Sequence, residues 1–136
     1  MKRNEDKLKH ALHNELVCNY LALQTDFPDW IITSAFYTSL HFISYKVFPF
    51  EAPSIEGGKT KIECIDDFMR YKGDKRLSKH ELLSNLASKK CKDISEDYDW
   101  LLNMSMTARY TNYYQSIPVA NKAISIMKKI KKYCIA

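Results

Sequence analysis

Glycine and proline are scarce in this sequence, and their scarcity restricts the fold. The 136 residues contain only 3 Gly and 4 Pro, well below average usage. A β-sandwich or β-barrel has a turn about every 8–12 residues and would need more of both. We therefore expect few, long, helical elements, and no strand longer than a pair of residues.

Long apolar segments are also missing. The longest uncharged stretch, residues 30–45, is shorter than the roughly 20 apolar residues that a membrane-spanning helix needs. The charged first residues are not followed by an apolar run, as they would be in a signal peptide. We therefore expect a cytoplasmic protein that does not enter a membrane.

Cysteines occur without the spacing of a metal or redox motif. None of the four is in a Cys-x-x-Cys pair; they are Cys18, Cys64, Cys91 and Cys134. In a chain of this size an even number alone does not indicate a disulfide framework. We expect small buried side chains in a reducing compartment.

The composition that remains is ordinary for one globular domain spanning residues 1–136. Hydrophobic residues make up 46% and charged residues 27%, which argues against intrinsic disorder. At this length a single core can bury roughly two-thirds of the surface of the unfolded chain. The domain therefore needs no disulfide or metal ion for its stability.

Positive charge is concentrated in two parts of the chain. The net charge is +5 overall, but residues 59–92 alone hold ten basic and five acidic side chains, and the segment from Ser116 onward holds five lysines and no acid. Two interpretations are open: an ordinary solvated surface, or a surface that faces phosphate groups.

Apolar residues recur with helical spacing along four long segments. The first follows Asn4, a suitable N-cap, and carries its apolar residues at Leu8, Leu12, Leu16 and Tyr20. The four segments cover about residues 5–24, 28–48, 94–113 and 116–133. The core residues that we predict from them are Trp30, Ile32, Phe36, Leu40, Ile43, Leu101, Leu102, Ile124 and Met127.

Two shorter helices are predicted between the second and third long segments. One covers about residues 60–71 and follows a loop marked by Gly57 and Gly58. The other begins at Ser78 with Glu81 three residues later, the pattern of a capping box. The expected fold is therefore an all-α, up-and-down bundle of four core helices with additional short helices.

Most familiar catalytic and metal-binding patterns are absent. Three glycines cannot supply a glycine-rich phosphate loop, and no zinc signature, Glu-x-x-His pair or local catalytic-triad motif occurs. His10 and His13 could touch one metal ion, but without an identifiable carboxylate partner a surface position is favoured. We expect no metal ion and no cofactor.

Three residues stand out as candidates for chemistry. His41 falls within the most apolar helix, Arg109 lies on the inward half of another helix, and His80 lies in a first turn, where backbone N–H groups are exposed. Each also has a structural interpretation. His41 could be a hydrogen-bonded core residue, Arg109 could pair with a buried acid or contact a carbonyl, and His80 could be an exposed helix-start residue.

Five short motifs follow one another along the chain: Asp29-Trp30, Ala35-Phe36-Tyr37, Leu40-His41, Lys79-His80 and Ala108-Arg109-Tyr110. This arrangement resembles small bacterial proteins of the HEPN (higher eukaryotes and prokaryotes nucleotide-binding) superfamily. The resemblance implies a dimeric bundle of four core helices. Many members are metal-independent endoribonucleases of toxin–antitoxin, CRISPR or phage-defence systems, and others are non-catalytic partners or modules that bind RNA or nucleotides.

The superfamily's active-site pattern is incomplete in this sequence. The pattern is an arginine, a polar residue and, several positions later, a histidine. Arg109 matches the first position, but Tyr110 takes the second and residues 114–116 include no histidine. Cleavage of RNA needs groups that accept and donate protons, so His80 or His41 would have to supply them from another helix.

The resemblance leads to an expected function and one alternative. We expect an RNA- or nucleotide-binding homodimer, with Arg109, Asn112 and Tyr113 on one helix face and further contacts from Lys79 and Arg76. The dimer seam is expected near the second or third long helix, beside the tyrosines of residues 110–114. The alternative is a catalytically inactive module, such as an antitoxin or adaptor subunit, whose partner is another protein.

Overall fold

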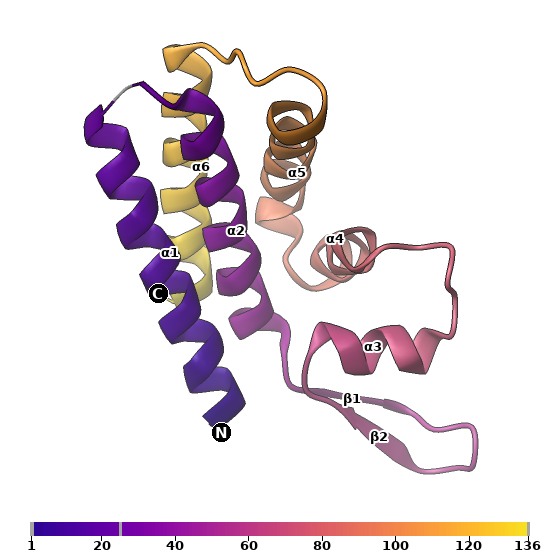
Figure 1. Ribbon diagram of the computed structural model, residues 1–136. Coiled ribbons are helices and arrows are strands. Elements are labelled where there is room, and N and C mark those ends of the chain that lie inside the picture. The colour runs from indigo at the N-terminus through magenta and orange to yellow at the C-terminus, as the bar shows by residue number, and fades with distance from the viewer. Residues whose placement is uncertain (1, 25, 136) are drawn as a thin grey trace.

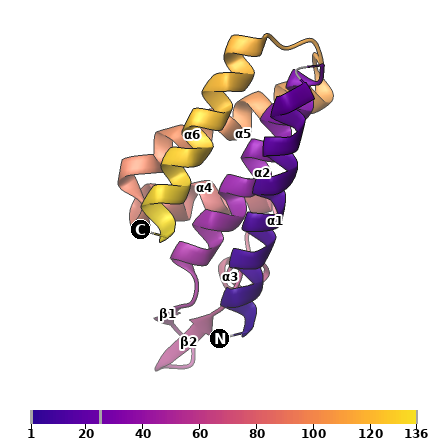
Figure 2. The same ribbon diagram turned by 90° about the vertical axis from the view of Figure 1, so that its left-hand side faces the viewer.

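Four long helices form the body of the computed structural model, which describes residues 2–24 and 26–135, with side chains from Asn4 onward. They are α1 (Lys2–Gln24), α2 (Pro28–Val47), α5 (Ser95–Tyr110) and α6 (Ile117–Ile135). Figure 1 shows that their directions alternate up and down, that α2 lies between α1 and α5, and that α6 lies behind α2. Helix α2 packs against the other three. The view turned by 90° shows α6 running beside α2 (Figure 2). The all-α bundle is thus confirmed.

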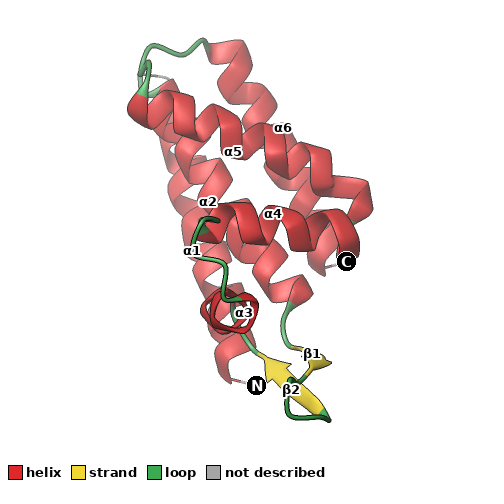
Figure 3. Cartoon of the chain, turned by 90° about the vertical axis from the view of Figure 1, so that its right-hand side faces the viewer, coloured by secondary structure: helices red, strands yellow, loops and turns green. Residues whose placement is uncertain are grey.

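Shorter elements connect the end of α2 to the start of α5. In chain order they are β1 (Phe50–Pro53), β2 (Lys59–Ile62), α3 (Ile65–Lys72), α4 (Lys79–Lys90) and the 3-10 turn η1 (Lys92–Ile94). The two strands form an antiparallel hairpin that extends away from the helices (Figure 3). The prediction that no strand exceeds two residues is therefore wrong, because each strand has four.

The hairpin replaces the first part of a predicted helix. Residues 60–62 are paired in β2, and the helix expected over residues 60–71 begins only at Ile65. Gly57 and Gly58 have φ angles of 94° and 74°, which only glycine adopts readily, so they turn the chain back and bring the strands together. The β-branched Thr60 and Ile62 then suit a strand.

The helix starts and ends that have local capping signals lie close to where the sequence predicts them. At the start of α4, Ser78 Oγ accepts a hydrogen bond from the backbone of Glu81, and the Glu81 carboxylate accepts one from the backbone of Ser78. Pro28 opens α2, and Gly73 ends α3 with a left-handed φ of 66°. The N-cap expected at Asn4 is wrong, since α1 already begins at Lys2.

Helix α5 ends three residues earlier than predicted. After Tyr110, the backbone N–H groups of Thr111 and Asn112 both donate to the carbonyl of Thr107. The Asn112 side chain then accepts a hydrogen bond of 3.0 Å from the backbone of Tyr114. Such a side-chain-to-backbone bond competes with helical hydrogen bonds, so Asn112 and Tyr113 lie in the connection to α6.

The core lies around α2, but it differs from the predicted core in four residues. Five of the nine predicted residues are fully buried: Ile32, Phe36, Ile43, Leu101 and Met127. Leu40, Leu102 and Ile124 are only partly buried. Trp30 is 55% exposed, because it lies in the first turn of α2 at the end of the bundle.

Helix α1 turns a different face to the core from the one its leucines predict. Its buried residues are Ala11 and Cys18, and Cys18 Sγ donates to the carbonyl of Ile31 in α2. Small side chains allow α1 and α2 to pack closely, and they leave the apolar series that includes Leu16 and Tyr20 on the outer surface. Among residues 2–24 and 26–135, no helix combines the length and apolar character that a membrane crossing requires.

Candidate functional site

Arg109, near the end of α5, lies in a group of aromatic side chains. Its guanidinium donates hydrogen bonds to the hydroxyl of Tyr37 at 2.8 Å and to the carbonyl of Ser105 at 3.2 Å. The guanidinium carbon lies 5.2 Å from the ring centre of Tyr37 and 4.9 Å from that of Tyr110. These cation–π contacts orient the arginine without cancelling its charge.

No carboxylate neutralises Arg109 within the part of the chain that the structure describes. Of the structural alternatives for this residue, the contact with a carbonyl is present and the pairing with a buried acid is not. Two of the acidic side chains of residues 93–99 make other contacts: Asp97 pairs with Lys129 at 2.7 Å, and Asp99 accepts from Ser84. The guanidinium also donates longer hydrogen bonds, of 3.3 to 3.4 Å, to the Tyr110 hydroxyl, Ser105 Oγ and Met106 Sδ. An anionic ligand would replace these longer contacts with charge-assisted ones.

His80, in the first turn of α4, packs against the same aromatic rings as Arg109. Its ring centre lies 5.4 Å from that of Phe36 and 6.3 Å from that of Tyr37. It is partly buried, which excludes the interpretation as an exposed helix-start residue. The structure thus brings together Phe36 and Tyr37 of α2, His80 of α4 and Arg109 of α5, which we call the Arg109 cluster.

The His80 side chain has an unused hydrogen-bonding atom. Its Nδ1 is buried and has no hydrogen-bond partner among the described residues. Burial, followed by the positive charges of Arg109 and Lys79, lowers the pKa of His80 from its ordinary value of 6.5. The imidazole is therefore neutral near pH 7 and able to accept a proton.

The other predicted RNA contacts do not form the regular helix face that the sequence implies. Asn112 and Tyr113 do not share a helix face with Arg109, because α5 ends at Tyr110. Tyr113 is instead stacked on Tyr114, with 4.3 Å between ring centres, and both are exposed. Lys79 pairs with Asp66 and Arg76 with Asp74.

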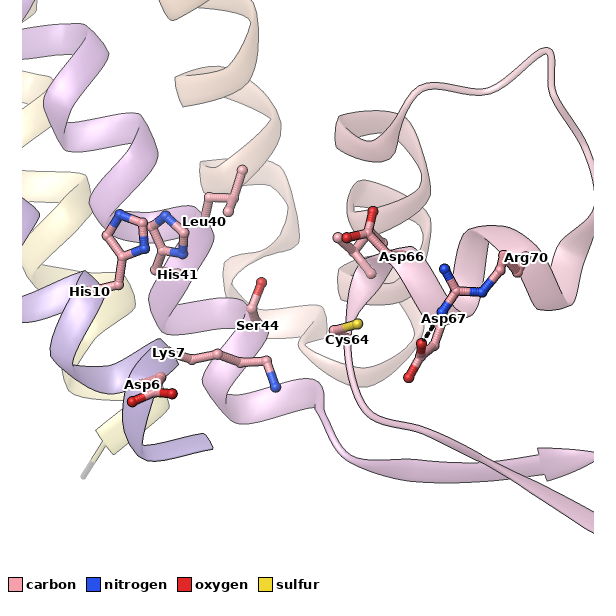
Figure 4. A pocket seen from close by; sticks show the side chains of 11 residues that line it. Asp6, Lys7, His10, Leu40, His41, Ser44, Cys64, Asp66, Asp67 and Arg70 are labelled. Carbon is pink, nitrogen blue, oxygen red and sulfur yellow. Dashed lines mark hydrogen bonds and ion pairs between the residues drawn. The ribbon is translucent and has the colours of Figure 1, made fainter. Parts of the chain in front are cut away.

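His41 is not part of the Arg109 cluster. Its ring is stacked on that of His10 with 3.7 Å between the centres, and no contact joins it to His80 or Arg109 in the described part of the chain. Both histidines line a cleft of about 520 Å³ between α1, α2 and α3 (Figure 4). The predicted catalytic role of His41 beside Arg109 therefore has no geometric support.

The stacking of His10 on His41 could have been predicted from the sequence by considering how two connected helices pack. Two antiparallel helices joined by a tight turn place residues opposite one another when their numbers have a constant sum. The contact between Cys18 and Ile31 has a sum of 49, close to the 51 of His10 and His41. A helical hairpin over residues 2–47 would therefore have placed these histidines together.

The charges of this cleft are mostly compensated. Asp67 pairs with Arg70, and Asp66 with Lys79 at 2.6 Å (Figure 4 shows the first pair). Lys7 donates to the carbonyl of Glu63 at 2.6 Å. The cleft therefore offers neither a cluster of free positive charges nor, in the described residues, a group of three metal-binding side chains.

We expect His41→Gln to flatten the pH dependence of stability between pH 6.5 and 4. Burial, and then the neighbouring His10, lower the pKa of His41 from 6.5 to about 4. Between these values the unfolded chain binds a proton that the folded His41 does not, so stability falls as the pH falls. Urea unfolding above and below this window measures the slope. The exposed His13→Gln is the control, and equal slopes for the two variants and wild type would contradict the prediction.

Comparison with known proteins gives no family assignment for this arrangement. No protein-family model matches the chain, and neither a curated protein nor a solved structure matches it. The function must therefore be argued from the cluster itself.

Proposed function

We propose that this chain is a HEPN-like RNA-binding protein in which Arg109 binds a phosphate of the RNA. The observation that carries the proposal is that two groups lie together around the rings of Phe36 and Tyr37. One is the Arg109 guanidinium, and the other is the His80 imidazole. Among the described residues the first has no carboxylate partner, and the buried Nδ1 of the second has no hydrogen-bond partner. An arginine presents a planar fork of donors that matches two phosphate oxygens. The aromatic contacts hold that fork in one orientation.

Further groups near the cluster suit a single strand of RNA. The exposed rings of Tyr110, Tyr113 and Tyr114 offer flat surfaces on which unpaired bases can stack. Lys79 and Arg76 lie in or just before the first turn of α4. Their ion pairs are exposed and therefore weak, so both cations can exchange their carboxylates for phosphates.

The same cluster holds the groups that metal-independent cleavage would require. A neutral His80 would accept the proton of a ribose 2′-hydroxyl as that oxygen forms its bond to phosphorus. Arg109 would stabilise the extra negative charge of the five-coordinate phosphorus. The bond to the 5′-oxygen then breaks, and this oxygen takes a proton, for which the Tyr37 hydroxyl is the nearest donor to Arg109.

The test is to measure binding and cleavage of end-labelled single-stranded RNA, with EDTA present throughout. We expect wild type to bind, Arg109→Ala to bind many times more weakly, and His80→Ala to bind but to lose any cleavage. Circular dichroism confirms that both variants remain helical. The proposal is wrong if wild type does not bind RNA, or if both folded variants bind and cleave like wild type.

The setting we propose is a defence or toxin–antitoxin system of the cytoplasm, with the chain acting as a homodimer. The free cysteines, three of them buried and Cys64 partly buried, suit a reducing compartment. The alternative, an inactive antitoxin or adaptor that binds another protein, is favoured by the large apolar surface of α1. Wild type that binds no RNA would support this alternative.

A further inference from the structure

Helix α1 carries a stripe of apolar side chains that face away from the bundle. Leu12, Leu16, Tyr20 and Leu23 are 37, 69, 65 and 79% exposed. Their spacing of three and four residues places them on one side of the helix, opposite the side on which Ala11 and Cys18 pack against α2. We call these four residues the α1 stripe. Isolated exposed apolar residues are normal, but a continuous stripe marks an interaction site.

The stripe has no exposed charge within it and opposite charges at its two ends. Between Leu12 and Leu23 the single charged residue is Glu15, whose side chain is 13% exposed and pairs with Lys131 at 2.9 Å. Lys9 lies three residues before the stripe and Asp26 three residues after it, both exposed. Charged residues are depleted from the centres of interfaces between proteins.

This order of charges is complementary to itself when two copies lie antiparallel. In a two-fold pair centred between residues 17 and 18, Leu12 of one copy lies opposite Leu23 of the other. Lys9 of each copy then lies near the end of the other copy's α1, which Asp26 follows. Leu16 then lies near Tyr20 of the other copy, so that apolar side chains meet throughout the centre. In a parallel pair, Lys9 would lie near Lys9 of the other copy and Asp26 near Asp26, so that like charges would repel.

The apolar area is sufficient for such a pair. Two further exposed aromatic side chains follow α1 where α2 begins: Phe27 and Trp30 are 49 and 55% exposed. Figure 1 shows that α1 ends and α2 begins at the same end of the bundle. A fully exposed aromatic side chain offers about 150–250 Å² and an aliphatic one about half as much, so at their exposed fractions these six residues supply roughly 500 Å². A standard interface buries about 800 Å² per partner, of which about 60% is apolar.

We propose that two copies of this chain associate through their α1 stripes in an antiparallel pair. This places the seam on α1, whereas the sequence led us to expect it on α2 or α5. Helix α2 is covered by α1, α5 and α6, which leaves α1 with the larger free apolar face. The inference concerns the partner and does not depend on RNA binding.

The experiment compares the masses of wild type, Leu16→Glu and Leu16→Lys by light scattering without RNA. Wild type should have twice the 15.9 kDa mass of one chain, and each variant should have the mass of one chain. In the antiparallel pair the two copies of residue 16 lie about 4.5 Å apart along the helix axis, so like charges repel. Mixing the two variants should restore the doubled mass, because opposite charges then meet.

The control is Ile55→Glu, which adds the same charge at the tip of the β1–β2 hairpin, where Ile55 is fully exposed. This variant should keep the doubled mass. The inference is wrong if wild type is monomeric at high micromolar concentration, if Leu16→Glu stays dimeric, or if the mixture stays monomeric. Because no RNA is present, these results are independent of the test of the proposed function.

Discussion

Phe36→Ala is expected to lower the free energy of unfolding by about 3–5 kcal/mol, the range for truncating a buried aromatic side chain. Phe36 is fully buried in the middle of α2. Its ring contacts those of Tyr37, His80 and Tyr98, with 5.0, 5.4 and 5.7 Å between centres. These partners come from α2, α4 and α5. The side chains around the cavity left by the missing ring therefore cannot fill it unless α4 or α5 moves. Urea unfolding followed by circular dichroism measures the loss.

Tyr114→Ala is the matched control for this prediction. It removes a ring of similar size from the connection between α5 and α6, where Tyr114 is 76% exposed, and it should cost about 0.5 kcal/mol or less, as surface substitutions do. Similar losses for the two variants would contradict the placement of Phe36 at the centre of the fold. Phe36→Leu should keep more of the stability than Phe36→Ala, because it fills more of the cavity.

The parts of the fold that depend on local chemistry could be predicted from the sequence. A capping box at Ser78, a proline at the first position of α2 and a glycine after α3 each specify a helix end by themselves. The end of α5 could not be found in this way. It depends on the Asn112 side chain bonding to the backbone of Tyr114, an interaction that competes with continuing the helix through residues 111–113.

The face of α1 shows why apolar periodicity can be misleading. The spacing of Leu12, Leu16 and Tyr20 predicts a buried stripe, yet the smaller Ala11 and Cys18 are buried instead. Periodicity shows that a helix has an apolar side, but it does not show whether that side meets the core or a partner. Here both sides are apolar, and the small residues allow the closer approach to α2.

The candidate site was predictable in composition but not in geometry. The sequence predicts one site that holds Arg109 and a nearby histidine, His80 in preference to His41, and the way α4 and α5 pack on α2 brings Arg109 and His80 to Phe36 and Tyr37. His41 was assigned to the same chemistry, but it is on the side of α2 that faces α1. Such assignments depend on the rotation of each helix, which the sequence does not specify.

Arg109→Ala is expected to weaken binding of single-stranded RNA by about 10- to 150-fold, which corresponds to the 1.5–3 kcal/mol of a hydrogen bond to a charged group. The logarithm of the binding constant should also fall less steeply with the logarithm of the salt concentration. The slope should be smaller in magnitude by about one, because one fewer phosphate is neutralised. Arg109→Lys should keep the slope and lose part of the affinity, since lysine retains the charge but lacks the planar fork. Fluorescence anisotropy at several salt concentrations measures both quantities.

Arg70→Ala is the matched control, because it removes the same charge from α3, where Arg70 is exposed and paired with Asp67. It should weaken binding only slightly. Equal losses for Arg70→Ala and Arg109→Ala would mean that RNA responds to the overall positive charge and not to the Arg109 cluster. An unchanged salt slope in Arg109→Ala would mean that Arg109 contacts no phosphate. In that case its hydrogen bond with Tyr37 would serve only to hold α5 against α2.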